Sequence, residues 1–257
     1  MKIAITGKGG VGKTTLAAVL SRIYAEEGFR VFAIDADPDA NLGLALGFPE
    51  ELISAIVPIA EMKDLIAERT SSEPGSFGTM FKLNPKVDDI PEAYCKAHEG
   101  VKLLSLGKKD TGGSGCLCPE NVLLKRLMSH LVLHDDHVVI LDMEAGIEHL
   151  TRGTAEGVDA FIVVVEPGIR SIQTYHHVRK LARDIGVQHI FVVANKIKSE
   201  SDKQYVQGNV EDVLGFIRYS DSVVGSDRVG ESPYHACEAL VEEVKAIRQK
   251  IVVGGGI

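Results

Sequence analysis

The sequence of 257 residues predicts an α/β fold. Short runs of aliphatic and β-branched residues alternate along the chain with longer amphipathic stretches, and this alternation is typical of βαβ units. The short runs are apolar throughout, as expected for strands that helices cover on both faces. We therefore expect a mostly parallel central sheet of about seven or eight strands, flanked by helices on both faces.

The elements follow one another in a regular order. The expected strands are Lys2–Thr6, Val31–Ile34, Val101–Leu106, Val138–Leu141, Ala160–Val165 and Ile190–Ala194, with a further strand near Val213–Ile217. The expected helices are Thr14–Glu26, Pro119–Leu133, Ser171–Ile185 and Pro233–Ile251. Residues from about 71 to 99 have no clear period and contain Ser-Ser, Pro, Gly and Asn-Pro, so we expect a loop-rich insertion with short helices there. The length suits a single domain spanning residues 1–257.

Composition excludes several classes of protein. Hydrophobic residues make up 45% and charged residues 25% of the chain, which is ordinary for a soluble globular protein. The net charge of −8 would repel nucleic acid and anionic lipid, so we expect neither as a partner. The chain opens directly on a strand, without the pattern of a signal peptide, and it has no apolar run of about 18 residues to cross a membrane. We expect a cytoplasmic protein.

A glycine-rich segment stands between the first strand and the first helix. It reads Gly7-Lys8-Gly9-Gly10-Val11-Gly12-Lys13-Thr14-Thr15 and contains the pattern G-x-x-x-x-G-K-[ST]. Backbone N–H groups of such a loop surround phosphate groups, and the helix that follows points its positive end at them. In this pattern Lys13 reaches the β- and γ-phosphates, and the Thr14 hydroxyl ligates Mg²⁺. A loop that makes only a tight turn is the alternative, but the flanking strand and helix favour a P-loop NTPase that binds ATP and Mg²⁺. The expected nucleotide-binding residues here are Gly9, Gly10, Val11, Gly12, Lys13, Thr14 and Thr15.

Carboxylates follow two of the expected strands. The second strand leads into Asp35-Ala36-Asp37-Pro38-Asp39-Ala40-Asn41, and strand alternation directs Asp35 and Asp37 to the same side. The fourth leads into Asp142-Met143-Glu144-Ala145-Gly146. Ligands of parallel sheets bind at the carboxyl ends of the strands, so we expect Asp35, Asp37 and Asp142 near the nucleotide. For Asp39, capping of the next helix is the better interpretation.

The additional lysine of the loop, Lys8, and the segment D-x-D-P-x-x-N resemble the deviant Walker A ATPases. This family contains the nitrogenase iron protein, the cell-division and partition ATPases and metal-insertion ATPases. The resemblance implies Mg²⁺-dependent hydrolysis of ATP to ADP and phosphate by a homodimer, in which Lys8 crosses the interface to the partner's nucleotide. It also implies that Asp37 orients or activates the attacking water. A solvated lysine on a loop tip is the alternative for Lys8.

The same resemblance implies roles for other strand-end residues. Asp35 would lie near Mg²⁺ through water, Asp142 would hold the hydration shell of the ion, and Gly146 would let the backbone approach the γ-phosphate. Asn195-Lys196 ends the strand IFVVAN, and an asparagine at this place reads the adenine edge in the family. Glu166-Pro167-Gly168 fits either the base pocket or a simple turn.

The chain has four cysteines, and two of them, Cys116 and Cys118, follow a glycine run and are separated by a single residue. Their sulfurs project to one side of an extended segment and suit a soft metal ion. Two thiolates leave such an ion undercoordinated, whereas a twofold dimer axis supplies two more and completes a site for Ni²⁺ or Zn²⁺. Redox-sensitive thiols or an intersubunit disulfide are the alternatives. We interpret Cys95 and Cys237 as structural.

Together, the cysteine pair, the deviant loop and the segment DMEAGIEHL resemble the nickel-insertion ATPases that mature carbon monoxide dehydrogenase. This resemblance implies a dimerising metallochaperone with carbon monoxide dehydrogenase as client. An ATPase that matures acetyl-CoA synthase shares every motif and stays open. A partition or septum-positioning ATPase is a further alternative, although the C-terminal segment lacks a strongly basic amphipathic face. Residues Met143 to Gly146 contain no cysteine, which argues against a bridging iron–sulfur cluster of the nitrogenase type.

Overall fold

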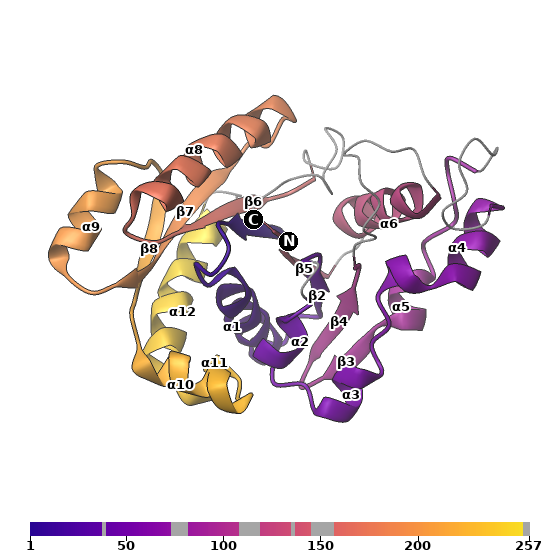
Figure 1. Cartoon of the computed structure of the whole chain (residues 1–257), viewed down its shortest axis with the longest axis horizontal. Coiled ribbons are helices and arrows are strands. Elements are labelled where there is room, and N and C mark those ends of the chain that lie inside the picture. Colours follow the sequence, from indigo (N-terminus) through magenta and orange to yellow (C-terminus); the bar gives the residue numbers. More distant parts are fainter. Residues whose placement is uncertain (38–39, 73–81, 108–118, 135–136, 145–156, 254–257) are drawn as a thin grey trace.

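The computed structural model describes residues 1–37, 40–72, 82–107, 119–134, 137–144 and 157–253. Within these residues the strands form a sheet of eight in the order β3-β4-β2-β5-β1-β6-β7-β8 (Figure 1). All neighbours pair in parallel except β3 and β4. The expected mostly parallel sheet is therefore confirmed. The strands are β1 Lys2–Gly7, β2 Val31–Asp35, β3 Lys96–His98, β4 Val101–Ser105, β5 Val138–Asp142, β6 Ala160–Val165, β7 Ile190–Ile197 and β8 Val213–Arg218.

Long helices cover both faces of the sheet. Helices α1 (Lys13–Glu26) and α12 (Glu238–Val253) contribute to the apolar cluster on one face, and α6 (Pro119–His134) and α8 (Ile169–Asp184) contribute to the cluster on the other. Each face therefore has its own hydrophobic core. The shorter helices are α2 Leu42–Ala45, α3 Glu50–Ser54, η1 Ile59–Glu61, α4 Lys63–Thr70, α5 Ile90–Tyr94, α9 Glu200–Gln207, α10 Asp221–Val229 and α11 Pro233–Ala236.

Strand alternation explains why the strand sequences are apolar throughout. In β2, Val31 and Ala33 belong to the cluster that contains α1, whereas Phe32 and Ile34 belong to the cluster that contains α6. All four side chains are at most 1% exposed. A strand with two buried faces needs apolar residues at every position.

Several elements differ from the sequence-based expectation, and the short helices α2, α3, η1, α4 and α9 were not expected. The expected helix Pro233–Ile251 is wrong as one helix, because extended backbone at Cys237 (φ −145°, ψ 90°) separates α11 from α12. The stretch from 71 to 99 contains the edge strand β3, which pairs antiparallel with β4. Helix α10 was not expected, and its residues line the cavity that the next subsection describes. None of the helices in the described part of the chain has the length and apolar character to span a bilayer.

The order of the strands creates a crevice at the carboxyl end of β1. From β1 the chain passes through α1 to β2 on one side of the sheet, whereas β6 and β7 lie on the other side of β1. Connections that diverge from a central strand leave the space outside its carboxyl end open to a ligand. The glycine-rich loop follows β1 and therefore lies at this crevice.

Candidate nucleotide-binding site

The glycine-rich loop has a backbone that only glycine adopts readily at three positions, Gly7, Gly10 and Gly12. Gly7 and Gly12 have φ angles of +148° and +96°. A Cβ atom on Gly7 would lie 2.4 Å from the carbonyl oxygen of Val164 in β6, and one on Gly12 would lie 2.2 Å from Nδ2 of Asn195 in β7. The loop thus passes directly against the two neighbouring strands, and a side chain at either position would displace it.

Two residues near the end of β7 form hydrogen bonds to the backbone of the glycine-rich loop. The Asn195 amide donates from Nδ2 to the carbonyl oxygen of Val11 (2.8 Å), and Lys196 donates from Nζ to the carbonyl oxygen of Gly10 (2.6 Å). The Lys196 N–H in turn donates to Oδ1 of Asn195 (2.7 Å). Lys196 has φ +58°, a strained value for a residue other than glycine. An amide nitrogen carries two hydrogens, and the bond to Val11 uses only one of those of Asn195. The expected contact between Asn195 and adenine is therefore compatible with this bond and stays a prediction.

Lys13 and Asp37 face each other at the start of α1. The Lys13 side chain is only 6% exposed, and its Nζ lies 4.0 Å from Oδ2 of Asp37. Both residues line the same cavity. The buried Lys13 ammonium is suited to bind a phosphate chain. The Asp37 carboxylate beside it is suited to contact a water molecule next to that chain.

Asp35 organises the backbone that leads to Asp37. Its carboxylate is 2% exposed and accepts hydrogen bonds from the N–H groups of Asp37 (3.2 Å) and Leu42 (2.9 Å). Burial raises the pKa of Asp35 to about 6, although these two hydrogen bonds oppose the rise. The family resemblance implied a place near Mg²⁺, through water, for Asp35, and that stays a prediction. The sequence did not predict these two hydrogen bonds, because they depend on where the backbone N–H groups of Asp37 and Leu42 lie relative to the Asp35 carboxylate.

Asp142 is a buried carboxylate at the end of β5. It is 1% exposed, and neither of its carboxylate oxygens has a hydrogen bond of normal geometry from a described residue, although the Thr14 hydroxyl lies near enough to lower the pKa of Asp142. Burial raises the pKa of Asp142 to about 7, whereas the nearby Thr14 hydroxyl and Lys13 ammonium lower it. A buried polar group without a partner is unfavourable unless a ligand satisfies it. Mg²⁺ prefers oxygen ligands, so the two carboxylate oxygens of Asp142 and the Thr14 hydroxyl fit this ion.

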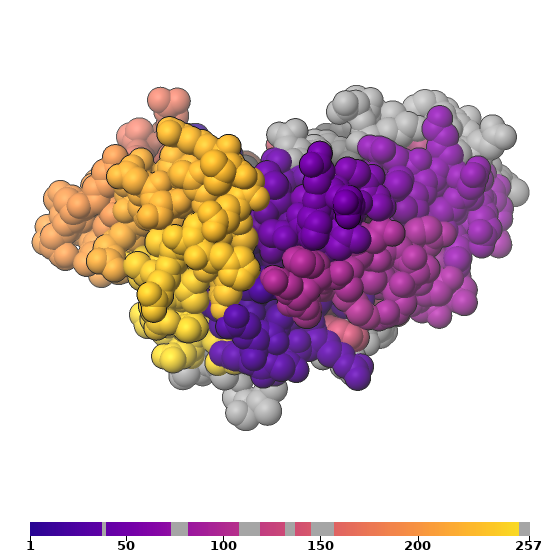
Figure 2. Space-filling view, turned by 90° about the horizontal axis from the view of Figure 1, so that it is seen from below, coloured from indigo at the N-terminus to yellow at the C-terminus, as the bar shows by residue number. Residues whose placement is uncertain are grey.

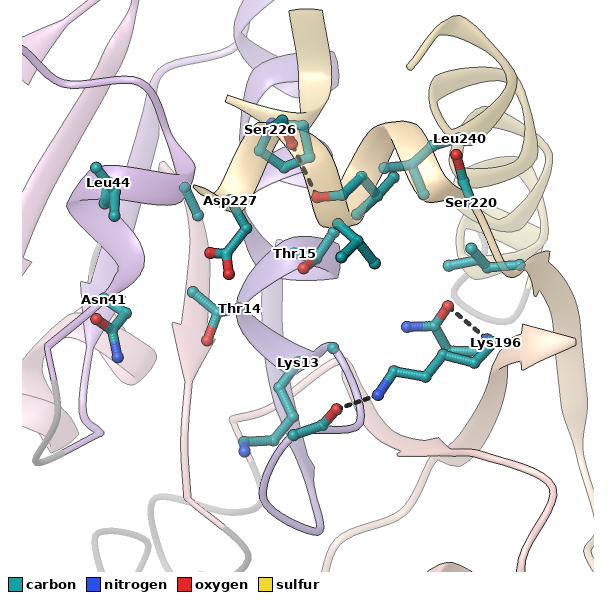
Figure 3. Close-up of a pocket in the computed structure, with 18 of the residues that line it drawn as sticks. Lys13, Thr14, Thr15, Asn41, Leu44, Lys196, Ser220, Ser226, Asp227 and Leu240 are labelled. Atoms are coloured by element: carbon teal, nitrogen blue, oxygen red, sulfur yellow. Dashed lines mark hydrogen bonds between the residues drawn. The ribbon is translucent and has the colours of Figure 1, made fainter. Parts of the chain in front are cut away.

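A cavity of about 680 Å³ extends from the loop toward the C-terminal part of the chain. Asn41 and Leu44 line one side, and the segment from Ile217 to Ser220, together with α10, lines the other. Figure 3 shows the Asp227 carboxylate directed into the cavity toward Thr14. Asp227 has no hydrogen bond or ion pair from its carboxylate to any described residue, and no sequence motif marked it.

Two segments far apart in the sequence meet beside this cavity, which Ala45 lines from one of them and Glu231 and Pro233 from the other. The Ser232 hydroxyl donates to the carbonyl oxygen of Ala45 (2.8 Å), and a Cβ atom on Gly47 would lie 3.1 Å from Cβ of Ser232. The space-filling view shows the C-terminal segment and the segment of α2 and α3 packed side by side (Figure 2). This part of the cavity wall therefore depends on contact between residues 45–47 and Ser232, which are far apart in the sequence.

The remaining expected site residues divide into two groups. Lys8 lies on the loop with its side chain 36% exposed and faces Glu166, which follows β6. Cys116, Cys118 and Gly146 lie outside the described residues. Among the residues that the structure does describe, no group of three or more His, Cys, Asp or Glu side chains is arranged to hold a metal ion. Cys95 and Cys237 are partly buried free thiols.

The fold and the site define a class of protein. A glycine loop after β1 leads into α1, Lys13 and Thr14 begin that helix, and the buried Asp142 stands beside them. This combination is that of a P-loop nucleoside triphosphatase. Residues 2–233 match the model of the family described as "CobQ/CobB/MinD/ParA nucleotide binding domain". The chain belongs to this family and is an ATPase.

Known proteins resemble the chain over almost its whole length. It is 46% identical to the carbon monoxide dehydrogenase accessory protein CooC of Rhodospirillum rubrum, over 96% of this chain and 94% of that protein. It is 43% identical to an uncharacterized ATP-binding protein of Methanocaldococcus jannaschii, over 98% of each. Among solved structures, the MinD cell division protein of Aquifex aeolicus has a TM-score of 0.68 at 20% identity, over 100% of this chain and 98% of that one. MinD of Pyrococcus horikoshii, solved with Mg-ADP, also has a TM-score of 0.68, at 19% identity over 100% and 99%. These two structures support the fold.

Proposed function

We propose that this ATPase acts as a dimer that handles a nickel ion during the maturation of carbon monoxide dehydrogenase. The observation that carries the proposed client is the 46% identity to CooC over nearly the full length of both chains. The observation that carries hydrolysis is the meeting of Lys13, Thr14 and Asp142 at one edge of the sheet. Nickel is inferred from the cysteine pair in the sequence.

Hydrolysis uses the residues at the carboxyl ends of β1, β2 and β5. The loop N–H groups and the Lys13 ammonium bind the β- and γ-phosphates and hold them in line for attack. Asp37, with its carboxylate 4.0 Å from the Lys13 ammonium, orients the attacking water and accepts its proton. Thr14 and Asp142 would hold Mg²⁺, which neutralises charge on the phosphates when bound. Asn195 and Lys196 keep the loop in place by their bonds to the carbonyl groups of Val11 and Gly10.

Lys8 makes hydrolysis depend on a second subunit. Its partly exposed ammonium stands on the surface of the loop rather than inside its own phosphate site. When two ATP-bound subunits meet face to face, Lys8 of each reaches the nucleotide of the other and stabilises the charge that develops on the transferred phosphoryl group. Dimer formation and turnover are then linked.

The metal ion is cargo rather than a resident cofactor. Cys116 and Cys118 of one subunit supply two thiolates, and the equivalent pair of the partner subunit supplies two more. Four thiolates suit Ni²⁺ in square-planar geometry or Zn²⁺ in tetrahedral geometry. Hydrolysis opens the dimer and releases the ion toward the client enzyme.

A calorimetric titration with Ni²⁺ tests the metal site. Wild type should bind about one ion per dimer in the presence of a non-hydrolysable ATP analogue, as expected for two subunits that share one S₄ site. The double substitution Cys116→Ala and Cys118→Ala should abolish this binding. The double substitution Cys95→Ala and Cys237→Ala is the matched control and should retain it. Tight binding of one ion per dimer by the Cys116/Cys118 variant would refute the site.

Activation of a client tests the remaining part of the proposal. The chain with ATP and Ni²⁺ should restore activity to nickel-free carbon monoxide dehydrogenase, and the Cys116/Cys118 variant should not. Nickel-free acetyl-CoA synthase in the same assay distinguishes the two clients. If only acetyl-CoA synthase is activated, that enzyme is the client and the proposal of carbon monoxide dehydrogenase is wrong.

A further inference from the structure

One carboxylate at the edge of the nucleotide site faces two lysines. Glu166 follows β6, and its Oε1 lies 3.9 Å from Nζ of Lys8 while its Oε2 lies 3.4 Å from Nζ of Lys196. The Glu166 N–H donates to the Ser171 hydroxyl at the start of α8 (3.0 Å), which anchors the turn that carries the carboxylate. Glu166 is not one of the residues that line the cavity, so its neighbours point to a role toward the lysines rather than toward the base.

The two lysines differ in how firmly they are held. Lys196 also donates to the carbonyl oxygen of Gly10 at 2.6 Å and belongs to the group that braces the loop. The Lys8 ammonium has no hydrogen bond and no second ion pair within the part of the chain that the structure describes. Glu166 is therefore the group that holds the Lys8 ammonium on its own subunit, and Lys8 is the more easily released of the two cations.

We propose that Glu166 retains Lys8 on its own subunit and thereby sets the protein concentration at which the ATP-bound dimer forms. The inference rests on the proposed crossing of Lys8 to the partner's nucleotide. Release of Lys8 leaves Glu166 paired with Lys196, so the carboxylate keeps a cation when the dimer closes. Glu166 is thus a positioning residue that acts through Lys8 and restrains association.

The size of the effect follows from the exposure of the pair. The side chains of Lys8 and Glu166 are 36% and 30% exposed, and a solvent-exposed ion pair changes an equilibrium by about 1.5- to 5-fold. A symmetric dimer releases two such pairs. Neutralising Glu166 is therefore expected to tighten the dimer by about 2- to 25-fold.

Sedimentation of the full-length Glu166→Gln variant with a non-hydrolysable ATP analogue tests the proposal. The dimer dissociation constant should fall by about 2- to 25-fold, and ATPase activity per subunit should reach half its maximum at a correspondingly lower protein concentration. An unchanged or weaker dimer would overturn the proposal. The affinity of the monomer for a fluorescent ATP analogue, measured below the concentration of dimer formation, is the control. A gain in that affinity as large as the gain in dimerisation would assign the effect to the nucleotide site and would also overturn it.

The Lys8→Ala variant separates this inference from the proposed function. If Lys8→Ala keeps full ATPase activity that depends on protein concentration, the crossing of Lys8 is wrong and the role of Glu166 is wrong with it. If Lys8→Ala abolishes that activity while Glu166→Gln dimerises like wild type, the crossing of Lys8 stands and only the restraint by Glu166 is wrong.

Discussion

Replacement of Asp142 by Asn should stabilise the free protein while it abolishes hydrolysis. Burial raises the pKa of Asp142 from 3.8 to about 7, and each pKa unit corresponds to about 1.4 kcal/mol. Holding this carboxylate in its charged form therefore costs the folded protein about 4 kcal/mol at pH 8. An amide buried without partners also costs about 1–2 kcal/mol, so Asp142→Asn should raise the free energy of unfolding by about 2 kcal/mol.

The stabilisation by Asp142→Asn should increase with pH. The pKa of Asp142 is higher in the folded protein than the unfolded value of 3.8, so the unfavourable contribution is absent below pH 3.8. It grows as the pH rises and is complete above about pH 7. The stabilisation by Asp142→Asn should therefore be about 1 kcal/mol smaller at pH 6 than at pH 8.

Urea unfolding in EDTA at pH 6 and pH 8 measures the effect. The Asp88→Asn variant, which removes an exposed carboxylate (60% exposed), is the control for the change in net charge. With Mg²⁺ and ATP the order should reverse, because the bound Mg²⁺ and ATP stabilise wild type more than the Asp142 variant, which lacks a charged oxygen ligand for the ion. A variant no more stable than wild type in EDTA at pH 8, or a gain that does not decrease at pH 6, would refute the reasoning.

Three further substitutions test the geometry of the site. Gly12→Ala should abolish ATP binding in calorimetry, because its Cβ would lie 2.2 Å from Nδ2 of Asn195 at a φ of +96°; a variant that binds ATP like wild type would contradict the position of the loop. Asn195→Ala leaves the carbonyl of Val11 without its donor and should lower the free energy of unfolding by about 1–3 kcal/mol, as urea unfolding would measure; unchanged stability together with weaker ATP binding would assign Asn195 to the base alone. Asp227→Asn should raise the KM for ATP with little change in kcat, because its carboxylate faces the cavity toward Thr14 and a carboxylate accepts hydrogen bonds from ribose hydroxyls; a fall in kcat at constant KM would place Asp227 in the chemistry instead.

The sequence was sufficient for the elements that contiguous residues form. The nine residues from Gly7 to Thr15 carry the glycines, the lysine and the hydroxyl of the phosphate loop in one local pattern. Strands buried on both faces are apolar at every position, and all seven expected strands are present with shifts at their ends. The sequence did not predict strand β3, because this strand has only three residues at the edge of the sheet and lies next to a turn. The apolar pattern of a buried strand is absent there.

Only the tertiary structure decided which distant residues complete the site. The bonds from Asn195 to Val11 and from Lys196 to Gly10 join positions that are 184 and 186 residues apart. They exist because β6 and β7 lie on one side of β1 while β2 and β5 lie on the other, an order that local periodicity does not specify. The position of Glu166 between Lys8 and Lys196 has the same origin. The sequence determined the chemistry that the loop can perform, and the packing of the strands determined which side chains hold that loop in position and restrain its lysine.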